Sequence, residues 1–102
     1  MPEQVRVLTL NDEERLVTYA KEIIRQLRHE QVRVESDLGP DPIKAKIAEA
    51  EKAKVHAMLV IGGRDMEAGN VSVRLHGKGN VGAKPKAEVI AEILASIRDR
   101  RS

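Results

Sequence analysis

The sequence contains no cysteine, phenylalanine or tryptophan, and Tyr19 is its only aromatic residue. The lack of cysteine excludes disulfides, thiolate zinc sites, iron–sulfur clusters and cysteine nucleophiles. The lack of aromatic rings disfavours proteins that bind nucleic acid by stacking bases on several exposed rings. The chain does have 41% hydrophobic residues, almost all aliphatic, in a length of 102 residues. This length and composition predict one globular domain over residues 1–102.

The sequence also lacks long hydrophobic runs and clustered metal ligands. No apolar run approaches the roughly 20 residues of a membrane span, and the first residues do not have the layout of a signal peptide. The three histidines are 27 and 20 residues apart, and none stands at metal-ligand spacing. No serine lies in a G-x-S-x-G motif. We therefore expect a cytoplasmic protein with no membrane contact, no metal, no cofactor and no catalytic residues in this chain.

The small net charge of +2 is unevenly distributed along the chain. Residues 1–51 carry a net charge of −3, and residues 52–102 carry +5. A polyanion would therefore meet the second half, where six basic side chains cluster in the sequence: Arg64, Arg74, His76, Lys78, Lys84 and Lys86. Two alternatives stay open, an ordinary solvated surface and an edge strand protected from aggregation by charge.

The first half of the chain predicts two strand–helix units. Residues 5–10 and 32–35 are short and rich in valine, which is typical of strands. Apolar residues with helical spacing predict a helix over about 12–30. The Asp-Pro pair at 41–42 predicts the start of a second helix, which ends near residue 53.

The second half predicts a central strand, an alternating strand and a final helix. Residues 57–61 are continuously apolar, as in a strand covered on both faces. After a polar turn at 64–70, residues 71–75 alternate, which places Arg74 on the face opposite to its apolar neighbours. The last helix begins near Pro85. The resulting order, βαβαββ(β)α, predicts an α/β fold with parallel strands and an antiparallel addition.

The segment GKGNVG at residues 77–82 matches the dinucleotide-binding pattern G-x-G-x-x-G. That pattern needs a helix and then a further strand with an acidic residue about 20 positions on. Only a helix follows in this sequence. We therefore interpret the segment as a turn, and a nucleotide-binding enzyme is the weaker alternative.

Several segments match one family in their order and spacing. They are PEQVRVL, YAKEIIRQLRHEQVRVESDL, Ile43 with Lys46-Ile47, MLVIGGRDMEAGNVSVR and a helix beginning near Pro85. Over about residues 2–101 the chain resembles the C-terminal anticodon-binding domain of class II aminoacyl-tRNA synthetases, and among these the threonyl enzymes most closely. The resemblance implies a three-layer α/β/α fold with a mixed, mostly parallel five-stranded sheet. It also implies binding of the tRNA anticodon stem–loop, and no catalysis by this chain alone, because the family's aminoacylation centre lies in a separate domain.

Two positions of the family's anticodon-reading set are matched by residues of this chain. They are Arg74, on the V-x-V-R strand, and Asp65, in the acidic turn where the family usually has glutamate. A guanidinium can donate two hydrogen bonds to a base edge or a phosphate, and a carboxylate can accept from base amino groups. Lys46, Lys78 and Lys84 are expected to be weaker phosphate contacts. The resemblance implies tRNA as the partner, with the anticodon stem–loop of tRNA-Thr as the first candidate.

Other positions depart from the pattern of the threonyl enzymes. Residues 39–42 read Gly-Pro-Asp-Pro where those enzymes usually have Arg-Asn-Glu-Lys, so Pro40 replaces an expected asparagine. Ala48 replaces an expected arginine. We therefore expect a tRNA-binding module of, or derived from, a threonyl-tRNA synthetase in which part of the anticodon-reading set is missing. If the chain is a fragment, the parent would be a threonine–tRNA ligase. A protein-interaction module that keeps the fold without reading RNA is the alternative.

Overall fold

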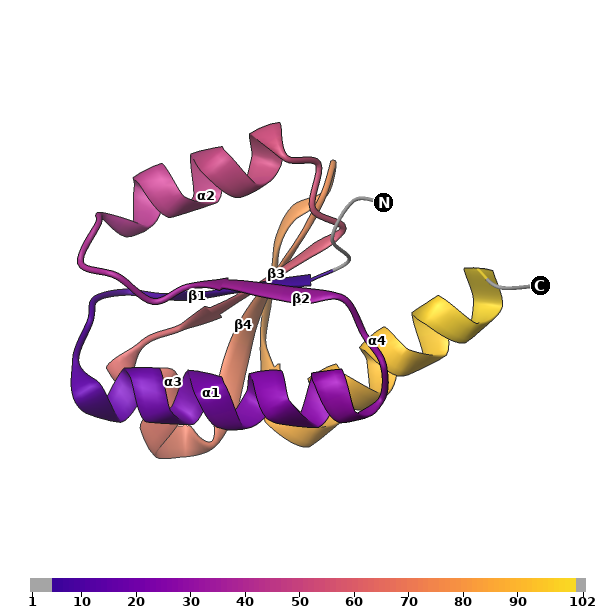
Figure 1. Ribbon diagram of the computed structural model, residues 1–102, viewed down its shortest axis with the longest axis horizontal. Coiled ribbons are helices and arrows are strands. Elements are labelled where there is room, and N and C mark those ends of the chain that lie inside the picture. Colours follow the sequence, from indigo (N-terminus) through magenta and orange to yellow (C-terminus); the bar gives the residue numbers. More distant parts are fainter. Residues whose placement is uncertain (1–4, 101–102) are drawn as a thin grey trace.

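The computed structural model describes residues 5–100, and the side chains of residues 5–95. Five strands form one sheet in the order β2-β1-β3-β4-β5, and helices cover both of its faces (Figure 1). In chain order the elements are β1 (Val5–Thr9), α1 (Glu14–His29), β2 (Val34–Asp37), α2 (Ile43–Lys52), β3 (Ala57–Ile61), α3 (Gly63–Ala68), β4 (Asn70–Leu75), β5 (Gly79–Pro85) and α4 (Lys86–Arg100). Among the described residues, no helix is long and apolar enough to span a membrane.

The sheet is mixed, as the sequence predicts. Strand β1 pairs in parallel with β2 and with β3, whereas β4 runs antiparallel to both β3 and β5. Four strands therefore run in one direction and β4 runs against them. The chain passes from β1 outward to β2 through α1, and then back across β1 to β3 through α2. Because both crossovers are right-handed and go in opposite directions, α1 and α2 lie on opposite faces of the sheet.

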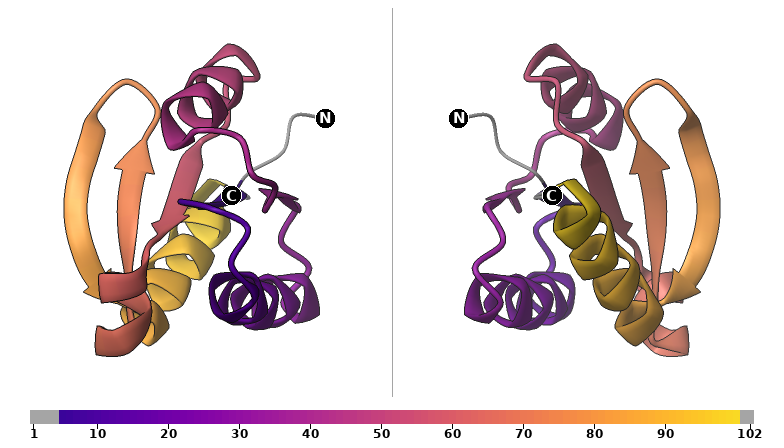
Figure 2. Two further views of the ribbon diagram at one scale, coloured as in Figure 1. Left: turned by 90° about the vertical axis from the view of Figure 1, so that its left-hand side faces the viewer. Right: turned by 90° about the vertical axis from the view of Figure 1, so that its right-hand side faces the viewer.

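Two apolar clusters, one on each face, hold together the three layers that Figure 2 shows. The larger cluster joins the sheet to α1 and α4, and its buried members include Val7, Leu16, Ile23, Leu27, Leu59, Val71, Val89 and Ile93. The smaller cluster joins the sheet to α2 and contains Leu8, Ala50, Val55 and Met58. The three-layer arrangement implied by the family resemblance is therefore confirmed.

Residues 64–70, which the sequence predicts as a polar turn, mostly belong to the short helix α3. The backbone N–H of Gly62, just before the helix, donates to Asp65 Oδ2 at 3.2 Å. Gly69 ends the helix with φ at 73°, a left-handed conformation that glycine adopts without strain. Local capping at both ends thus stabilises one and a half turns of helix in a segment with little apolar periodicity.

The turn predicted for GKGNVG covers only the start of that segment. Gly77 and Gly79 have positive φ and form the turn between β4 and β5. Residues from Gly79 onward pair with β4 as an edge strand, with a register shift between Val73 and Arg74. Glycine weakens a strand, so the hydrogen bonds to β4 outweigh local preference here. This segment supplies the fifth strand that the resemblance implied.

Candidate nucleic-acid interface

The exposed side of β4 presents Arg74 and Ser72 on the same face of the sheet as α2. Arg74 pairs with Met58 of β3, and Ser72 pairs with Val60. Side chains of directly paired residues lie on the same face, and Met58 packs in the cluster beneath α2. Arg74 and Ser72 are both half-buried, so this part of the face is still open to a ligand. The alternation predicted for residues 71–75 is confirmed.

Arg74 has an unsatisfied hydrogen-bond donor. Its Nε atom is buried and has no hydrogen-bond partner among the residues that the structure describes. A buried donor without an acceptor costs about 1–3 kcal/mol, and most buried polar groups in proteins are paired. Because Nε is covered, a ligand recovers that cost only if the side chain shifts, whereas the outer guanidinium nitrogens of this half-buried residue are open to a ligand on this face. The planar guanidinium also suits two parallel hydrogen bonds to a base edge or a phosphate.

Asp65, in the first turn of α3, is held next to Ser72 by two neighbours. Its Oδ2 accepts from the Gly62 N–H, and its Oδ1 and Oδ2 lie 3.4 and 3.3 Å from Ser72 Oγ. Ser72 precedes Arg74 by two residues, a distance of about 6.7 Å along a strand. The carboxylate has about four lone-pair sites, so it can still accept from a ligand amino group while these contacts hold its orientation.

Ser72 is the residue of this group to which sequence reasoning assigned no role. The only signal was the alternation of β4, which puts Ser72 on the same face as Arg74. Its hydroxyl links the α3 cap to the strand and thereby couples the position of Asp65 to that of Arg74.

The three lysines expected at phosphates lie in three different environments. Lys46 is 1% exposed, and its Nζ donates to the carbonyl oxygens of Thr9 at 2.8 Å and Gly39 at 2.7 Å. Its ammonium is therefore occupied inside the protein, and the structure does not support the phosphate contact expected for it. Lys78 is exposed in the turn between β4 and β5, where a phosphate can reach it.

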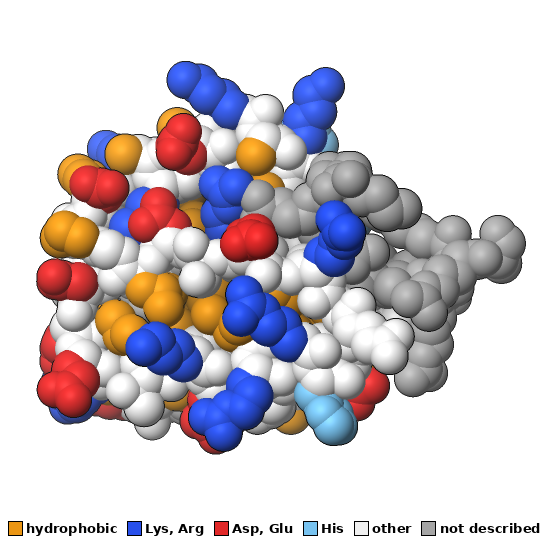
Figure 3. Space-filling view, viewed as in Figure 1, with side chains coloured by type: hydrophobic (Ala, Val, Ile, Leu, Met, Phe, Trp, Pro, Cys, Tyr) orange, Lys and Arg blue, Asp and Glu red, His pale blue; other side chains and the backbone are white. Residues whose placement is uncertain are grey.

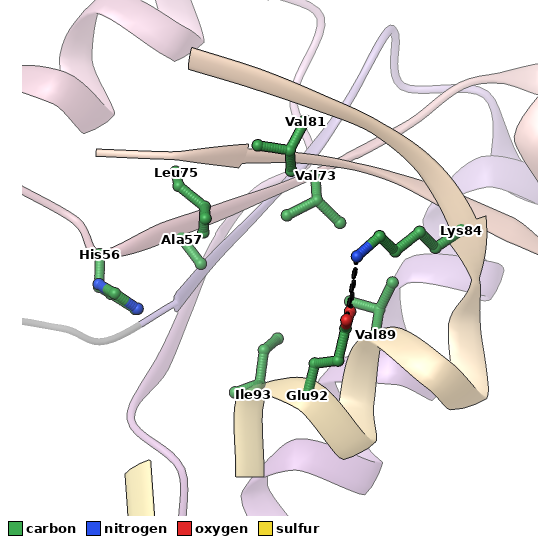
Figure 4. Close-up of a pocket in the computed structure, with 9 residues that line it drawn as sticks. All are labelled: His56, Ala57, Val73, Leu75, Val81, Lys84, Val89, Glu92 and Ile93. Atoms are coloured by element: carbon green, nitrogen blue, oxygen red, sulfur yellow. Dashed lines mark hydrogen bonds and ion pairs between the residues drawn. The ribbon is translucent and has the colours of Figure 1, made fainter. Parts of the chain in front are cut away.

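Lys84 lies on the other face of the sheet from Arg74. It pairs with Val71, which is buried in the cluster under α1 and α4, and its Nζ bonds to Glu92 Oε1 at 3.0 Å. Figure 4 shows this ion pair beside a pocket lined by His56, Ala57, Val73, Leu75, Val81, Val89 and Ile93. Lys84 therefore does not join the group formed by Arg74 and Asp65.

Tyr19 connects α1 to the beginning of β4. Its hydroxyl donates to the Asn70 carbonyl oxygen at 2.9 Å, and Lys86 Nζ lies 5.1 Å from the centre of its ring. Burial raises the pKa of Tyr19 above its usual 10.0, and the negative charges of Asp65 and Glu22 raise it further. The only aromatic residue of the sequence thus makes its contacts within the protein, on the α1 side of the molecule.

Comparison with known proteins identifies the family of this fold and site. Residues 4–96 match the family described as "Anticodon binding domain". The chain belongs to this family. This anticodon-binding domain is 42% identical, over 98% of its length, to the threonine–tRNA ligase of Carboxydothermus hydrogenoformans, and 43% identical, also over 98%, to that of Chlorobaculum tepidum. It spans only 16% and 15% of these two curated relatives, so the similarity is confined to one domain of each ligase.

Solved structures have the same fold. The RNA-binding domain of threonyl-tRNA synthetase from Cryptosporidium parvum Iowa II superposes with a TM-score of 0.83 at 25% identity, over 92% of this anticodon-binding domain and 23% of that chain. A prolyl-tRNA synthetase from Cryptosporidium parvum superposes with a TM-score of 0.80 at 22% identity, over 97% of this domain and 22% of that chain, and supports the fold alone.

Proposed function

We propose that this domain binds the anticodon stem–loop of a tRNA on the open part of the sheet face that carries Arg74, Ser72 and Asp65. Arg74 donates to a base edge or a phosphate, and Asp65 accepts from a base amino group. Lys78 makes a phosphate contact at the end of the same strand. With a single aromatic residue in the sequence, recognition uses hydrogen bonds and charge rather than base stacking.

The observation that carries this proposal is the half-buried guanidinium of Arg74, which has no acceptor within the described residues. A guanidinium that served only to stabilise the fold would be expected to have its buried donor paired. The carboxylate of Asp65 is already oriented by Gly62 and Ser72, so one acceptor stands preorganised near Arg74. Preorganisation lowers the entropic cost of binding.

Relatives that match almost the whole chain suggest tRNA-Thr as the ligand. The relatives that cover this chain at 42% and 43% identity are threonine–tRNA ligases. We also propose that discrimination between tRNAs is weaker than in the threonyl enzymes, because Pro40 and Ala48 stand where those enzymes usually have asparagine and arginine. The absence of each base-reading hydrogen-bond pair lowers discrimination by about 1–3 kcal/mol.

Binding of tRNA-Thr and of an unrelated tRNA, measured by fluorescence anisotropy over a series of salt concentrations, tests the proposal. Wild-type protein should bind tRNA-Thr saturably at low salt. Arg74→Ala should weaken that binding by roughly 5- to 150-fold, the equivalent of about 1–3 kcal/mol. Arg15→Ala is the matched control, because Arg15 is exposed on α1 and pairs only with nearby Glu13 among the described residues.

Two results would contradict the proposal. One is the absence of saturable tRNA binding at low salt by the wild-type protein. The other is equal binding by Arg74→Ala and Arg15→Ala, with both variants folded by circular dichroism. A protein partner that covers residues 39–42, and that tRNA does not displace, would instead favour the interaction module.

A further inference from the structure

A second basic surface lies on the opposite side of the molecule from Arg74, in a groove between α1 and the edge strand β2. Six residues line this α1–β2 groove: Lys21, Ile24, Arg25, Arg28, Ser36 and Leu38. Figure 3 looks onto this side and shows hydrophobic side chains between α1 and β2 with lysine and arginine side chains beside them. The groove therefore has an apolar floor and a cationic rim.

The three cations form a row along one face of α1. Lys21, Arg25 and Arg28 stand at i, i+4 and i+7, and a rise of 1.5 Å per residue separates the first from the last by about 10.5 Å along the helix. Like charges at i and i+4 destabilise a helix by roughly 0.2–0.5 kcal/mol. Arg28 lies in the last turn, where a cation is favourable, but the Lys21–Arg25 pair opposes helix stability rather than supporting it.

Within the residues that the structure describes, no carboxylate neutralises the first two cations. Lys21 and Arg25 form no hydrogen bond or ion pair there. The nearest acidic residue in sequence, Glu22, lies 3.9 Å from Lys86. Arg28 donates from Nη2 to the Val34 carbonyl oxygen at 3.2 Å, which fixes its guanidinium at the edge of β2.

The strand that borders the groove turns its acidic side chains away. Val34 packs in the cluster beneath α1, so the alternation of β2 puts Ser36 on the α1 side and Glu35 and Asp37 on the other. The groove therefore presents two unpaired cations, one anchored guanidinium and a hydroxyl, without a facing carboxylate from β2. This combination suits an anionic polymer whose charges repeat along a line.

We propose that the α1–β2 groove binds phosphates of the same tRNA, at a second contact separate from the face that carries Arg74. The proposal rests on the proposed function, since tRNA is the polyanion that this face would recruit. Strands β1 and β3 lie between β2 and β4, so the two contacts are at least three strand spacings, about 14 Å, apart. A ligand that contacts both surfaces at once must span at least this distance, as a folded RNA does.

The salt dependence of tRNA binding by the double variant Lys21→Gln/Arg25→Gln tests this contact. Arg28 is left in place because it bonds to the edge of β2. The slope of log K against log salt should become shallower by about 0.7–0.9 for each phosphate that is no longer neutralised, or about 1.4–1.8 in total. Because phosphates carry no sequence information, affinity for tRNA-Thr and for an unrelated tRNA should fall by the same factor.

The control is Arg15→Gln, which removes an exposed cation from another part of α1, outside the residues that line the groove. A slope that is unchanged in Lys21→Gln/Arg25→Gln, or reduced equally in the control, would overturn the groove contact. If Arg74→Ala still weakens binding in that case, the proposed function stands without the groove. If wild-type protein binds no tRNA, both proposals fail. Binding of a polyglutamate peptide that requires Lys21 and Arg25, with tRNA binding unchanged in the double variant, would assign the groove to an acidic protein.

Discussion

Replacement of Lys46 by methionine tests whether a buried ammonium holds the loop between β2 and α2. Lys46 Nζ donates to Thr9 O at 2.8 Å and to Gly39 O at 2.7 Å, and the side chain is 1% exposed. Lys46→Met keeps most of the aliphatic volume but leaves both carbonyls without this donor. Each buried acceptor that is left unsatisfied costs about 1–3 kcal/mol. The substitution also removes a buried charge, and the desolvation cost saved in this way offsets part of the loss from the two acceptors. We expect the free energy of unfolding to fall by about 3 kcal/mol.

Urea unfolding followed by far-UV circular dichroism measures this decrease, since the sequence has no tryptophan to report by fluorescence. With an m-value of about 1.5 kcal/mol/M, the urea midpoint should fall by about 2 M. Lys44→Met is the control, because Lys44 is exposed on the same helix and a surface change of this kind stays within about 0.5 kcal/mol. Equal midpoints for the two variants would refute the stabilising role of the Lys46 hydrogen bonds.

Two further predictions concern α1 and α3. A spectrophotometric pH titration should give the single tyrosine, Tyr19, a pKa above 10.0, because burial and nearby carboxylates favour its neutral form. Since the pKa is raised in the folded state, the stability that Tyr19 contributes is complete below pH 10.0 and declines as the pH rises through the higher folded pKa. A normal pKa would contradict this. Gly69→Ala should cost about 1 kcal/mol in urea unfolding because Gly69 has φ at 73°. Gly63→Ala, where a Cβ meets nothing within 4 Å, should be near neutral, and equal destabilisation of the two variants would argue against backbone strain.

The helices and central strands were predictable because their apolar periodicity is strong. The helix predicted over 12–30 is α1, Glu14–His29, and the apolar run at 57–61 is β3. Helix α3 was not predicted, and β5 entered the predicted order only as the optional strand of βαβαββ(β)α. Helix α3 is stabilised by a glycine N–H and a carboxylate rather than by an apolar face, and β5 owes its strand conformation to pairing with β4. Both depend on contacts that residue spacing alone does not encode.

The candidate site was predictable in part, for a related reason. Strand alternation correctly placed Arg74 opposite its apolar neighbours, and the match to the family pattern pointed to Asp65. Neither signal distinguishes a lysine on the surface from one whose ammonium turns inward, as Lys46 does to reach Thr9 and Gly39. Likewise, the register that puts Lys84 beside Val71, on the far face, is set by the pairing of β4 with β5. The face on which a charged side chain lies is a tertiary property in both cases.

The two proposed RNA contacts differ in what they supply, and this makes them experimentally separable. A base contact by Arg74 contributes discrimination between tRNAs, whereas phosphate contacts by Lys21 and Arg25 contribute affinity that is uniform across sequences and declines with salt. If both contacts exist, removal of the Arg74 side chain should narrow the difference between tRNA-Thr and an unrelated tRNA, and removal of the groove cations should leave that difference intact. Since the sequence offers one aromatic residue, and Tyr19 is tied to Asn70 and Lys86, no stacking contribution from it would mask this separation.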